Sequence, residues 1–201
     1  MEDPNPLVAG RGLSLLRDAG IEVRCGLLEH EAREMNIGFV ARMTRGTPWV
    51  RMKVAASLDG KTALHNGVSQ WLTGPAARAD GHAWRARACA ILTGIGTVRE
   101  DDPSLTVREV ETTRQPLRIV VDSRLEISPT AKVLANGNAL VICANGDHER
   151  ASRLRDLGVE VLDLPNTTGK VDLSALLRTL GERQLNELHV EAGYKLNRSL
   201  L

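Results

Sequence analysis

The stretch LTGIGTVREDDPSLTVR, residues 92–108, places two glycines directly after a short apolar run. Read with the residues before it, AILTGIGT (90–97) is predicted to be a buried strand. Glycines after such a strand let backbone N–H groups approach a phosphate, and Thr97 can add a hydroxyl. Arg99 stands where the dinucleotide fingerprint has its third glycine. Gly94 and Gly96 are therefore candidates for a nucleotide site, with a plain strand turn as the alternative.

Strands and helices alternate along the rest of the chain. Further strands are predicted at 49–57, 116–123, 139–145, 159–164 and 187–193, and helices at 75–90, 148–158 and 172–183. Pro75 would occupy the first position of its helix, where its missing N–H costs nothing. This alternation predicts an α/β fold with an at least partly parallel sheet, and ligands at the strand ends.

The first 46 residues have a different pattern. We expect a helix at 12–18, a short strand at 21–28 and a helix at about 29–43, followed by TRGTPW (44–49), which has the glycine and proline of a linker. Such a piece is too small to be a domain. It either packs against the rest of the chain or is the end of a domain that lies upstream.

Bulk composition excludes several classes of function. The net charge is +1 and five residues are aromatic, so nucleic acid and membrane surfaces are not expected partners. The three cysteines are far apart and form no CxxC pair, which argues against zinc and disulfides. No secretion signal or apolar run of about 18 residues is found. We expect a cytoplasmic protein.

Several polar residues are candidates for chemistry. Asp101 and Asp102 are expected in a turn, which could be merely a solvated acidic turn. Arg108 adds a positive charge to the same loop. Lys53 lies in a predicted strand, and the loop after it carries Ser69 and Trp71, which could line a cofactor groove or act as a packing lid.

Arg85 and Arg87 lie on the next predicted helix, where arginines usually face solvent. Ser123 ends a predicted strand, where its hydroxyl can meet a ligand. The final segment, VEAGYKLNRSLL (190–201), repeats the order of strand, glycine and helix around Gly193. This order predicts either a second phosphate-binding turn or a simple connecting loop. No GxSxG, HExxH or clustered Cys/His is present, so hydrolase and metal chemistry are unsupported and no metal ligand is assigned.

Three ordered motifs within residues 53–108 resemble the reductase domain of the bifunctional riboflavin-biosynthesis deaminase/reductases. They are KVAASLDGKTA, SQWLT and GIGTVREDDPSLTVR, and the opening EDPNPLVAGRGLSLLRDAGIEV is similar to the end of the family's deaminase domain. The resemblance implies a dihydrofolate-reductase-like fold. It also implies NADPH-dependent reduction of the ribose of 5-amino-6-(5-phosphoribosylamino)uracil to a ribityl chain. Residues 1–46 would be the deaminase remnant and linker, and residues 47–201 the reductase domain.

The resemblance also implies roles for individual residues. Asp101 would be the acid or orienting group, with Lys53 as electrostatic support. The expected cofactor-binding residues are Ala55, Trp71, Gly94, Gly96, Thr97, Asp101, Ser123, Gly193, Tyr194 and Lys195. The expected substrate-binding residues are Ser69, Arg85, Leu105, Arg108 and Glu191, with the two arginines clamping the phosphate.

The chain departs from the family pattern in three respects. No P-C-x-x-C occurs and the only H-x-E is HVE at 189–191, so we expect neither deaminase activity nor its zinc. Family members continue for several strands beyond the equivalent of Leu201 and commonly use them in dimerisation, so the sheet is expected to be truncated here and the full-length protein to be a homodimer. Tyr194 stands where the family has a small residue or proline. The alternatives are a dihydrofolate-reductase-like NADPH enzyme acting on another substrate, or a non-catalytic nucleotide-binding remnant.

Overall fold

The computed structural model describes residues 1–65, 68 and 72–201 and divides into two compact units. Unit 1 comprises residues 1–49 and 177–186, and unit 2 comprises residues 50–176 and 187–201. The first boundary lies three residues beyond the predicted one. The assignment of residues 1–46 to a deaminase remnant stays a prediction.

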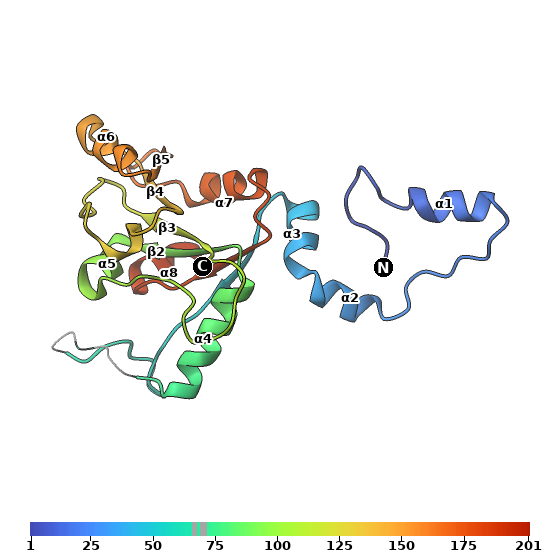
Figure 1. Ribbon diagram of the computed structural model, residues 1–201, viewed down its shortest axis with the longest axis horizontal. Coiled ribbons are helices and arrows are strands. Elements are labelled where there is room, and N and C mark those ends of the chain that lie inside the picture. The colour runs from blue at the N-terminus through green and yellow to red at the C-terminus, as the bar shows by residue number, and fades with distance from the viewer. Residues whose placement is uncertain (66–67, 69–71) are drawn as a thin grey trace. The chain divides into compact units, whose positions relative to one another are not determined.

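A six-stranded sheet organises the chain (Figure 1). Its order is β1-β6-β2-β3-β4-β5, so the last strand inserts between the first two. The strands are β1 (Trp49–Met52), β2 (Ala90–Gly94), β3 (Leu117–Val121), β4 (Ala139–Cys143), β5 (Glu160–Asp163) and β6 (Glu187–Val190).

The strands run parallel, which confirms the predicted α/β class. Pairing is parallel from β6 through β2, β3 and β4 to β5. The β1 register is also parallel, because Trp49 N–H donates to Asn186 O and Lys53 N–H to Val190 O. The strands β2, β3 and β4 are almost entirely buried. Apart from Thr93 and Arg118 these strands are apolar, which is typical of parallel strands that are covered on both faces.

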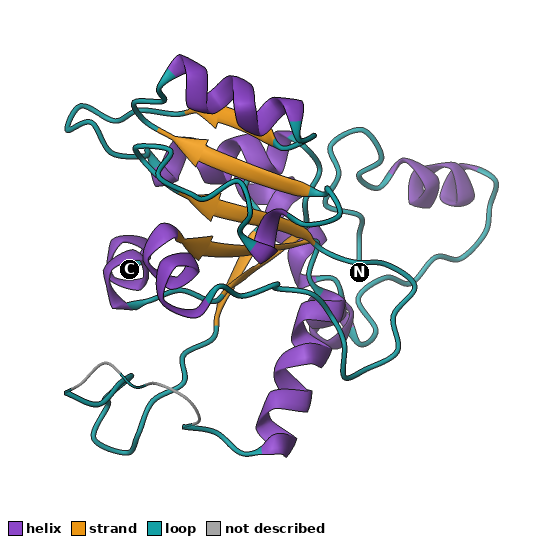
Figure 2. Ribbon diagram, turned by 60° about the vertical axis from the view of Figure 1, so that its left-hand side comes forward, coloured by secondary structure: helices purple, strands orange, loops and turns teal. Residues whose placement is uncertain are grey.

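Helices lie alongside these strands (Figure 2). They are α4 (Pro75–Arg87), α5 (Ile95–Asp101), α6 (His148–Asp156), α7 (Leu173–Glu182) and α8 (Tyr194–Leu200), with a 3₁₀ turn at Lys132–Leu134. As predicted, α4 begins with Pro75. The Asp147 side chain caps α6 by accepting from the N–H groups of Glu149 and Arg150. A core cluster joins α5 and α6 to one face of the sheet through Val98 and Leu154.

Two boundaries in unit 2 differ from prediction. The strand predicted at 90–97 ends at Gly94, and Ile95–Asp101 is helical. The pairing of β2 with β3 also ends there, at Gly94 opposite Val121, so a longer strand would leave its backbone groups unpaired. The strand predicted at 49–57 ends at Met52.

Unit 1 contains three helices among its described N-terminal residues. They are α1 (Arg11–Asp18), α2 (Glu29–Met35) and α3 (Ile37–Arg45). The single helix predicted at 29–43 is interrupted at Asn36, which leaves the helical region with φ −110° and ψ 23°. The strand predicted at 21–28 is wrong, because these residues form no regular structure. A lone strand without a neighbour leaves its hydrogen-bonding groups unpaired.

Unit 1 also contains a close backbone approach. A Cβ added at Gly181 of α7 would overlap the carbonyl oxygen of Gly46, which follows α3. Beside it, Arg42 donates from Nε to the Asn186 side chain at 2.7 Å. Within the described residues of both units, every helix is too short or too polar to cross a membrane.

Candidate functional site

The strand order places the predicted site residues on neighbouring strands. In a parallel sheet all carboxyl ends meet at one edge. Lys53 follows β1, Glu191 follows β6, Gly94 ends β2 and Ser123 lies two residues after β3. Four segments that are far apart in the sequence therefore meet in adjacent positions along this edge.

The two glycine turns are in contact. The Gly193 N–H donates to Thr97 Oγ1 at 3.2 Å. A Cβ added at Gly193 would lie 3.7 Å from the same oxygen, and one at Gly96 would meet nothing within 4 Å. Neither Gly94 nor Gly193 has positive φ, so glycine supplies no special backbone conformation at these positions. A Cβ added at Gly94 would lie 3.4 Å from the Leu196 side chain, so this glycine allows α8 to pack closely. The helix after Gly193 begins with Tyr194, a residue that is 68% exposed and whose ring centre lies 5.9 Å from Lys195 Nζ.

A largely buried ion pair lies beside the Gly193 turn. Arg85 of α4 donates from Nε and Nη2 to the two carboxylate oxygens of Glu191, the second at 2.9 Å. Its Nη1 donates to Thr106 O at 3.1 Å. The side chains of Arg85 and Glu191 are 14% and 15% exposed. The pair therefore fixes the guanidinium and ties α4, the end of β6 and the 103–108 loop together.

Glu191 remains ionised in this setting. Burial by itself would raise its pKa, but the hydrogen bonds of Arg85 and His189 and their charges hold the pKa well below its usual range. His189 Nε2 lies 3.5 Å from Glu191 Oε1, and the His189 side chain is almost fully buried. The carboxylate is thus a permanent acceptor and not a proton donor near neutral pH.

His82 positions the neighbouring Arg108. The Arg108 N–H donates to His82 Nδ1 at 3.1 Å, and the Arg108 side chain donates to Ser104 Oγ and Thr106 Oγ1. Burial, followed by the charges of Arg85 and Arg108, lowers the pKa of His82. A neutral His82 can accept at Nδ1, as the Arg108 N–H requires.

Leu105 contributes to the core. Its side chain is 3% exposed and belongs to the main apolar cluster, and its backbone has a positive φ of 49°. The predicted contact with substrate could thus be made only by its backbone. The positive φ turns the chain so that residues on either side of Leu105 reach the surface while Leu105 packs inward.

The two adjacent aspartates occupy different positions. Asp101 is the exposed last residue of α5, so its predicted turn is wrong: the helix includes Asp101, and Asp102 is the residue that caps it. Asp102 has positive φ and accepts from the N–H of Lys132 at 2.9 Å. This hydrogen bond is the main reason that its pKa is lowered. Asp102 therefore anchors the loop before β4.

Lys53 borders a cavity of about 380 Å³ between β1, β6 and α4. His189 also lines this cavity, as do Asp80 and Trp84, with the Arg51 guanidinium 3.9 Å from the Trp84 ring centre. Lys53 is exposed and Ala55 half-buried. Lys53 and His189 therefore line the same cavity, and His189 is the residue that contacts Glu191.

Ser123 has a structural contact as well. Its hydroxyl accepts from the Val171 N–H at 3.3 Å, and its carbonyl accepts from Ala144 and Asn145. These bonds hold the tip of β3. Ser69 and Trp71 lie outside the described residues, and their roles stay predictions, as do those of the other site residues.

Sequence reasoning missed His82 and His189. His189 could have been found, because alternate residues of a strand share a face and Glu191 follows it by two. His82 carries no local signal, since its partner Arg108 lies 26 residues away. The described residues contain no group of three or more metal-ligating side chains.

Comparison with known proteins covers both units. The model of the RibD C-terminal domain family matches residues 48–201. The chain is 42% identical over its whole length to the riboflavin biosynthesis protein RibD of Bacillus amyloliquefaciens and covers 54% of that protein.

Solved structures show the same fold. Acinetobacter baumannii RibD (form 1) matches with a TM-score of 0.87 at 42% identity, over 99% of this chain and 55% of that one. A diaminohydroxyphosphoribosylaminopyrimidine deaminase/5-amino-6-(5-phosphoribosylamino)uracil reductase from Thermotoga maritima matches with a TM-score of 0.80 at 34% identity, over 96% and 52%. The chain thus spans about half the length of the curated relatives it matches.

Proposed function

The chain belongs to the RibD C-terminal domain family, and from this premise we propose that it performs a reductase step of riboflavin biosynthesis. The proposed reaction is the NADPH-dependent reduction of the ribose of 5-amino-6-(5-phosphoribosylamino)uracil to a ribityl chain. The observation that supports it best is the fixed Arg85–Glu191 pair beside the Gly193 turn. A sugar phosphate is bound best by charged side chains that are already held in position before it arrives.

The carboxyl edge of the sheet suits a dinucleotide. The space beside Gly96 is open, and Thr97 Oγ1 adjoins the Gly193 turn. We assign cofactor binding to Ala55, Trp71, Gly94, Gly96, Thr97, Asp101, Ser123, Gly193, Tyr194 and Lys195. When bound, a reduced nicotinamide supplies the hydride that C1′ of the sugar must receive.

The substrate phosphate would be held by Arg85 and Arg108. Arginine has five N–H donors, of which the Arg85 contacts to Glu191 and Thr106 use three, so two remain for a phosphate. Ser69 and the Leu105 backbone would complete the substrate site. Glu191, held ionised, would accept hydrogen bonds from the sugar hydroxyls.

The proton for the developing nitrogen or oxygen is assigned to Asp101, as donor or as orienting group, with Lys53 as electrostatic support. Asp101→Asn in the full-length protein should lower the steady-state rate of substrate-dependent NADPH oxidation by about 100-fold, the lower end of what a general acid contributes. The matched control is Asp156→Asn at the end of α6. A near wild-type rate for Asp101→Asn would remove Asp101 from the mechanism.

The proposal extends to the whole protein. Residues 1–46 would complete a deaminase domain that carries its own zinc, and the cytoplasmic protein would be a homodimer. Light scattering of the full-length protein at twice the monomer mass would agree with the homodimer, and a monomer mass would exclude it.

A further inference from the structure

His189 is a buried histidine on the last strand, β6. The residue is 1% exposed, and neither ring nitrogen makes a hydrogen bond of good geometry with the described residues. Burial of a polar group without a hydrogen bond is unfavourable, so native structures contain few such groups. The position of this ring therefore needs an explanation beyond packing.

The Glu191 carboxylate lies next to this ring. Alternate residues of an extended chain point to the same face, so the side chains of His189 and Glu191 project together. Nε2 of His189 lies 3.5 Å from Oε1 of Glu191. Because a carboxylate can only accept hydrogen bonds, this contact is favourable when Nε2 carries a proton, as it does in one neutral tautomer and in the charged ring. Hydrogen bonds in active sites are often long before the substrate binds and tighten when it does.

The two oxygens of the Glu191 carboxylate have different surroundings. Oε1 accepts from Arg85 Nε and lies beside His189 Nε2. Oε2 accepts from Arg85 Nη2 at 2.9 Å, which is its only hydrogen bond from the described residues. Each carboxylate oxygen has room for about two donors. Arg85 and His189 therefore occupy Oε1, and one acceptor position on Oε2 remains open for a hydroxyl of the sugar.

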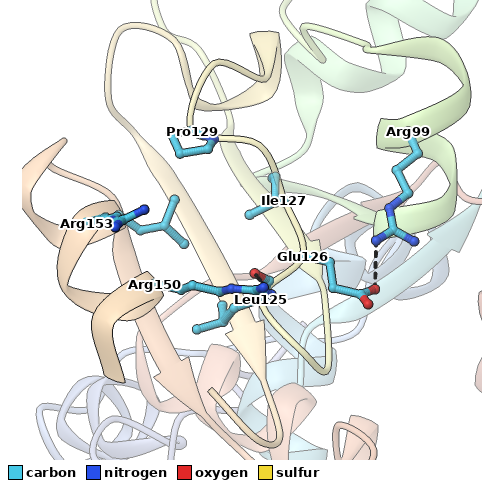
Figure 3. Close-up of a pocket in the computed structure, with 8 residues that line it drawn as sticks. Arg99, Leu125, Glu126, Ile127, Pro129, Arg150 and Arg153 are labelled. Carbon is cyan, nitrogen blue, oxygen red and sulfur yellow. Dashed lines mark hydrogen bonds and ion pairs between the residues drawn. The ribbon is translucent and has the colours of Figure 1, made fainter. Parts of the chain in front are cut away.

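Glu126 shows that arginines alone can hold a carboxylate in this protein. It lies at the pocket beside the tip of β3, with Arg99 at 2.8 Å and Arg124 at 3.1 Å (Figure 3). Both arginine side chains are at least half exposed. Long exposed side chains keep much of their rotational freedom, whereas a buried ring with few rotatable bonds holds its donor in one place. The histidine beside Glu191 thus adds a fixed donor that simple anchoring of a carboxylate does not require.

We propose that His189 is a positioning residue of the reductase site and that its Nε2–H fixes the Glu191 carboxylate so that Oε2 faces the sugar of the substrate. This inference rests on the proposed function, in which Glu191 accepts from the sugar hydroxyls. His189 acts through Glu191 and contacts neither the substrate nor the cofactor. A group misplaced by about 1 Å can lower a rate by about 100-fold. Removal of His189 leaves the Arg85 bonds in place, so a smaller loss of about tenfold is expected.

Two substitutions separate the donor of the ring from its bulk. His189→Gln places an amide N–H near the position of Nε2 and so keeps a donor for Glu191. His189→Met has a similar length and volume but no donor. A purely structural role of the ring predicts that the glutamine variant performs no better than the methionine variant. Urea unfolding of both variants measures the structural part separately.

Kinetics of the full-length protein supply the first readout. His189→Met should lower kcat/KM for the sugar phosphate substrate by about tenfold, the equivalent of one lost charge-assisted hydrogen bond. His189→Gln should stay within about threefold of wild type. The KM for NADPH should be unchanged in both variants, because Glu191 contacts the sugar and not the cofactor. Equal losses in the two variants, or a loss that appears in the KM for NADPH, would overturn the proposal.

A third variant keeps the test decisive if His189→Met does not fold. The amide of His189→Asn ends near the position of Nδ1 and does not reach Glu191, so this variant should lose activity as the methionine variant does. Wild-type activity in folded His189→Asn would contradict the assignment of the donor to Nε2.

Calorimetry provides a second readout that needs no turnover. Ribose 5-phosphate should bind wild type more tightly than inorganic phosphate does, because Glu191 accepts from the sugar. His189→Met should lower the affinity for ribose 5-phosphate by about tenfold, whereas His189→Gln should keep it. The affinity for inorganic phosphate should change by less than about twofold in either variant, because Arg85 and Arg108 hold the phosphate. Equal binding of the two ligands by wild type would overturn the proposal.

The inference and the proposed function fail in different ways. If wild type oxidises no NADPH with the substrate but loses its preference for ribose 5-phosphate in His189→Met, the proposed reaction is wrong and the positioning role stands. If wild type turns over NADPH and His189→Met keeps both its kcat/KM and its preference for the sugar, only the positioning role is wrong.

Discussion

Among the arginine–glutamate pairs of unit 2, Arg85–Glu191 and Arg99–Glu126 lie in contrasting surroundings. The side chains of Arg85 and Glu191 are 14% and 15% exposed, and Arg85 binds both carboxylate oxygens of Glu191. The side chains of Arg99 and Glu126 are 52% and 25% exposed. The buried pair is shielded from water and salt, so removal of one partner leaves the other charge buried and uncompensated. The exposed pair is screened and contributes little to stability. The comparison teaches that ion pairs of the same residue types differ in what they do. The buried pair fixes its side chains in one place, whereas the exposed pair leaves its arginine in contact with water.

The largest expected effect comes from breaking the buried pair. Arg85→Met keeps most of the apolar stem but leaves Glu191 charged and without its main partner, so the free energy of unfolding should fall by about 3 kcal/mol. Equilibrium urea unfolding at neutral pH measures this loss. Removing both charges, in Arg85→Met/Glu191→Gln, should recover part of the loss.

The exposed pair provides the matched control for that measurement. Arg99→Met should change the free energy of unfolding by no more than about 0.5 kcal/mol. Equal losses in Arg85→Met and Arg99→Met would contradict the distinction between the two pairs.

A smaller effect is expected in the pH dependence of the free energy of unfolding, through His82. Because the pKa of His82 is lowered in the folded protein, the unfolded chain takes up a proton first as the pH falls below about 6.5. Stability should therefore fall from that pH down to the folded pKa of His82, with a slope of at most about 1.4 kcal/mol per pH unit. His82→Asn, whose amide oxygen can replace Nδ1 as acceptor, should lose this slope. An unchanged slope in His82→Asn would refute the assignment to His82.

Glu191 contributes in a separate pH window. Its folded pKa lies below its unfolded value, so the stability it gives is full above about pH 4.5 and is lost as the pH falls through the folded pKa. The two contributions can therefore be distinguished in one series of unfolding curves.

The sheet was the most predictable part of the fold. The largely apolar sequences of β2, β3 and β4 identify buried parallel strands, because their few polar residues do not alternate along the strand to form a polar face. The start of α5 was not predictable in this way. Its sequence, IGTVRED, contains a glycine and three β-branched residues near its start, which are poor helix formers. The helix begins where the pairing of β2 with β3 ends.

The site was predictable in its members but not in its contacts. Strand alternation and the strand-end rule identify Glu191, Gly94 and Ser123 as candidates. The bond between Arg85 and Glu191 joins residues 106 positions apart, which no local pattern encodes. The strand predicted at 21–28 failed for the same reason, since a strand depends on a distant partner.

The contact between Gly181 and the Gly46 carbonyl has a consequence for how the protein is made. Both residues belong to unit 1, but they are separated by more than half of the chain. On the ribosome, residues 1–49 emerge long before residues 177–186, so unit 1 cannot close until nearly all of unit 2 has been synthesised.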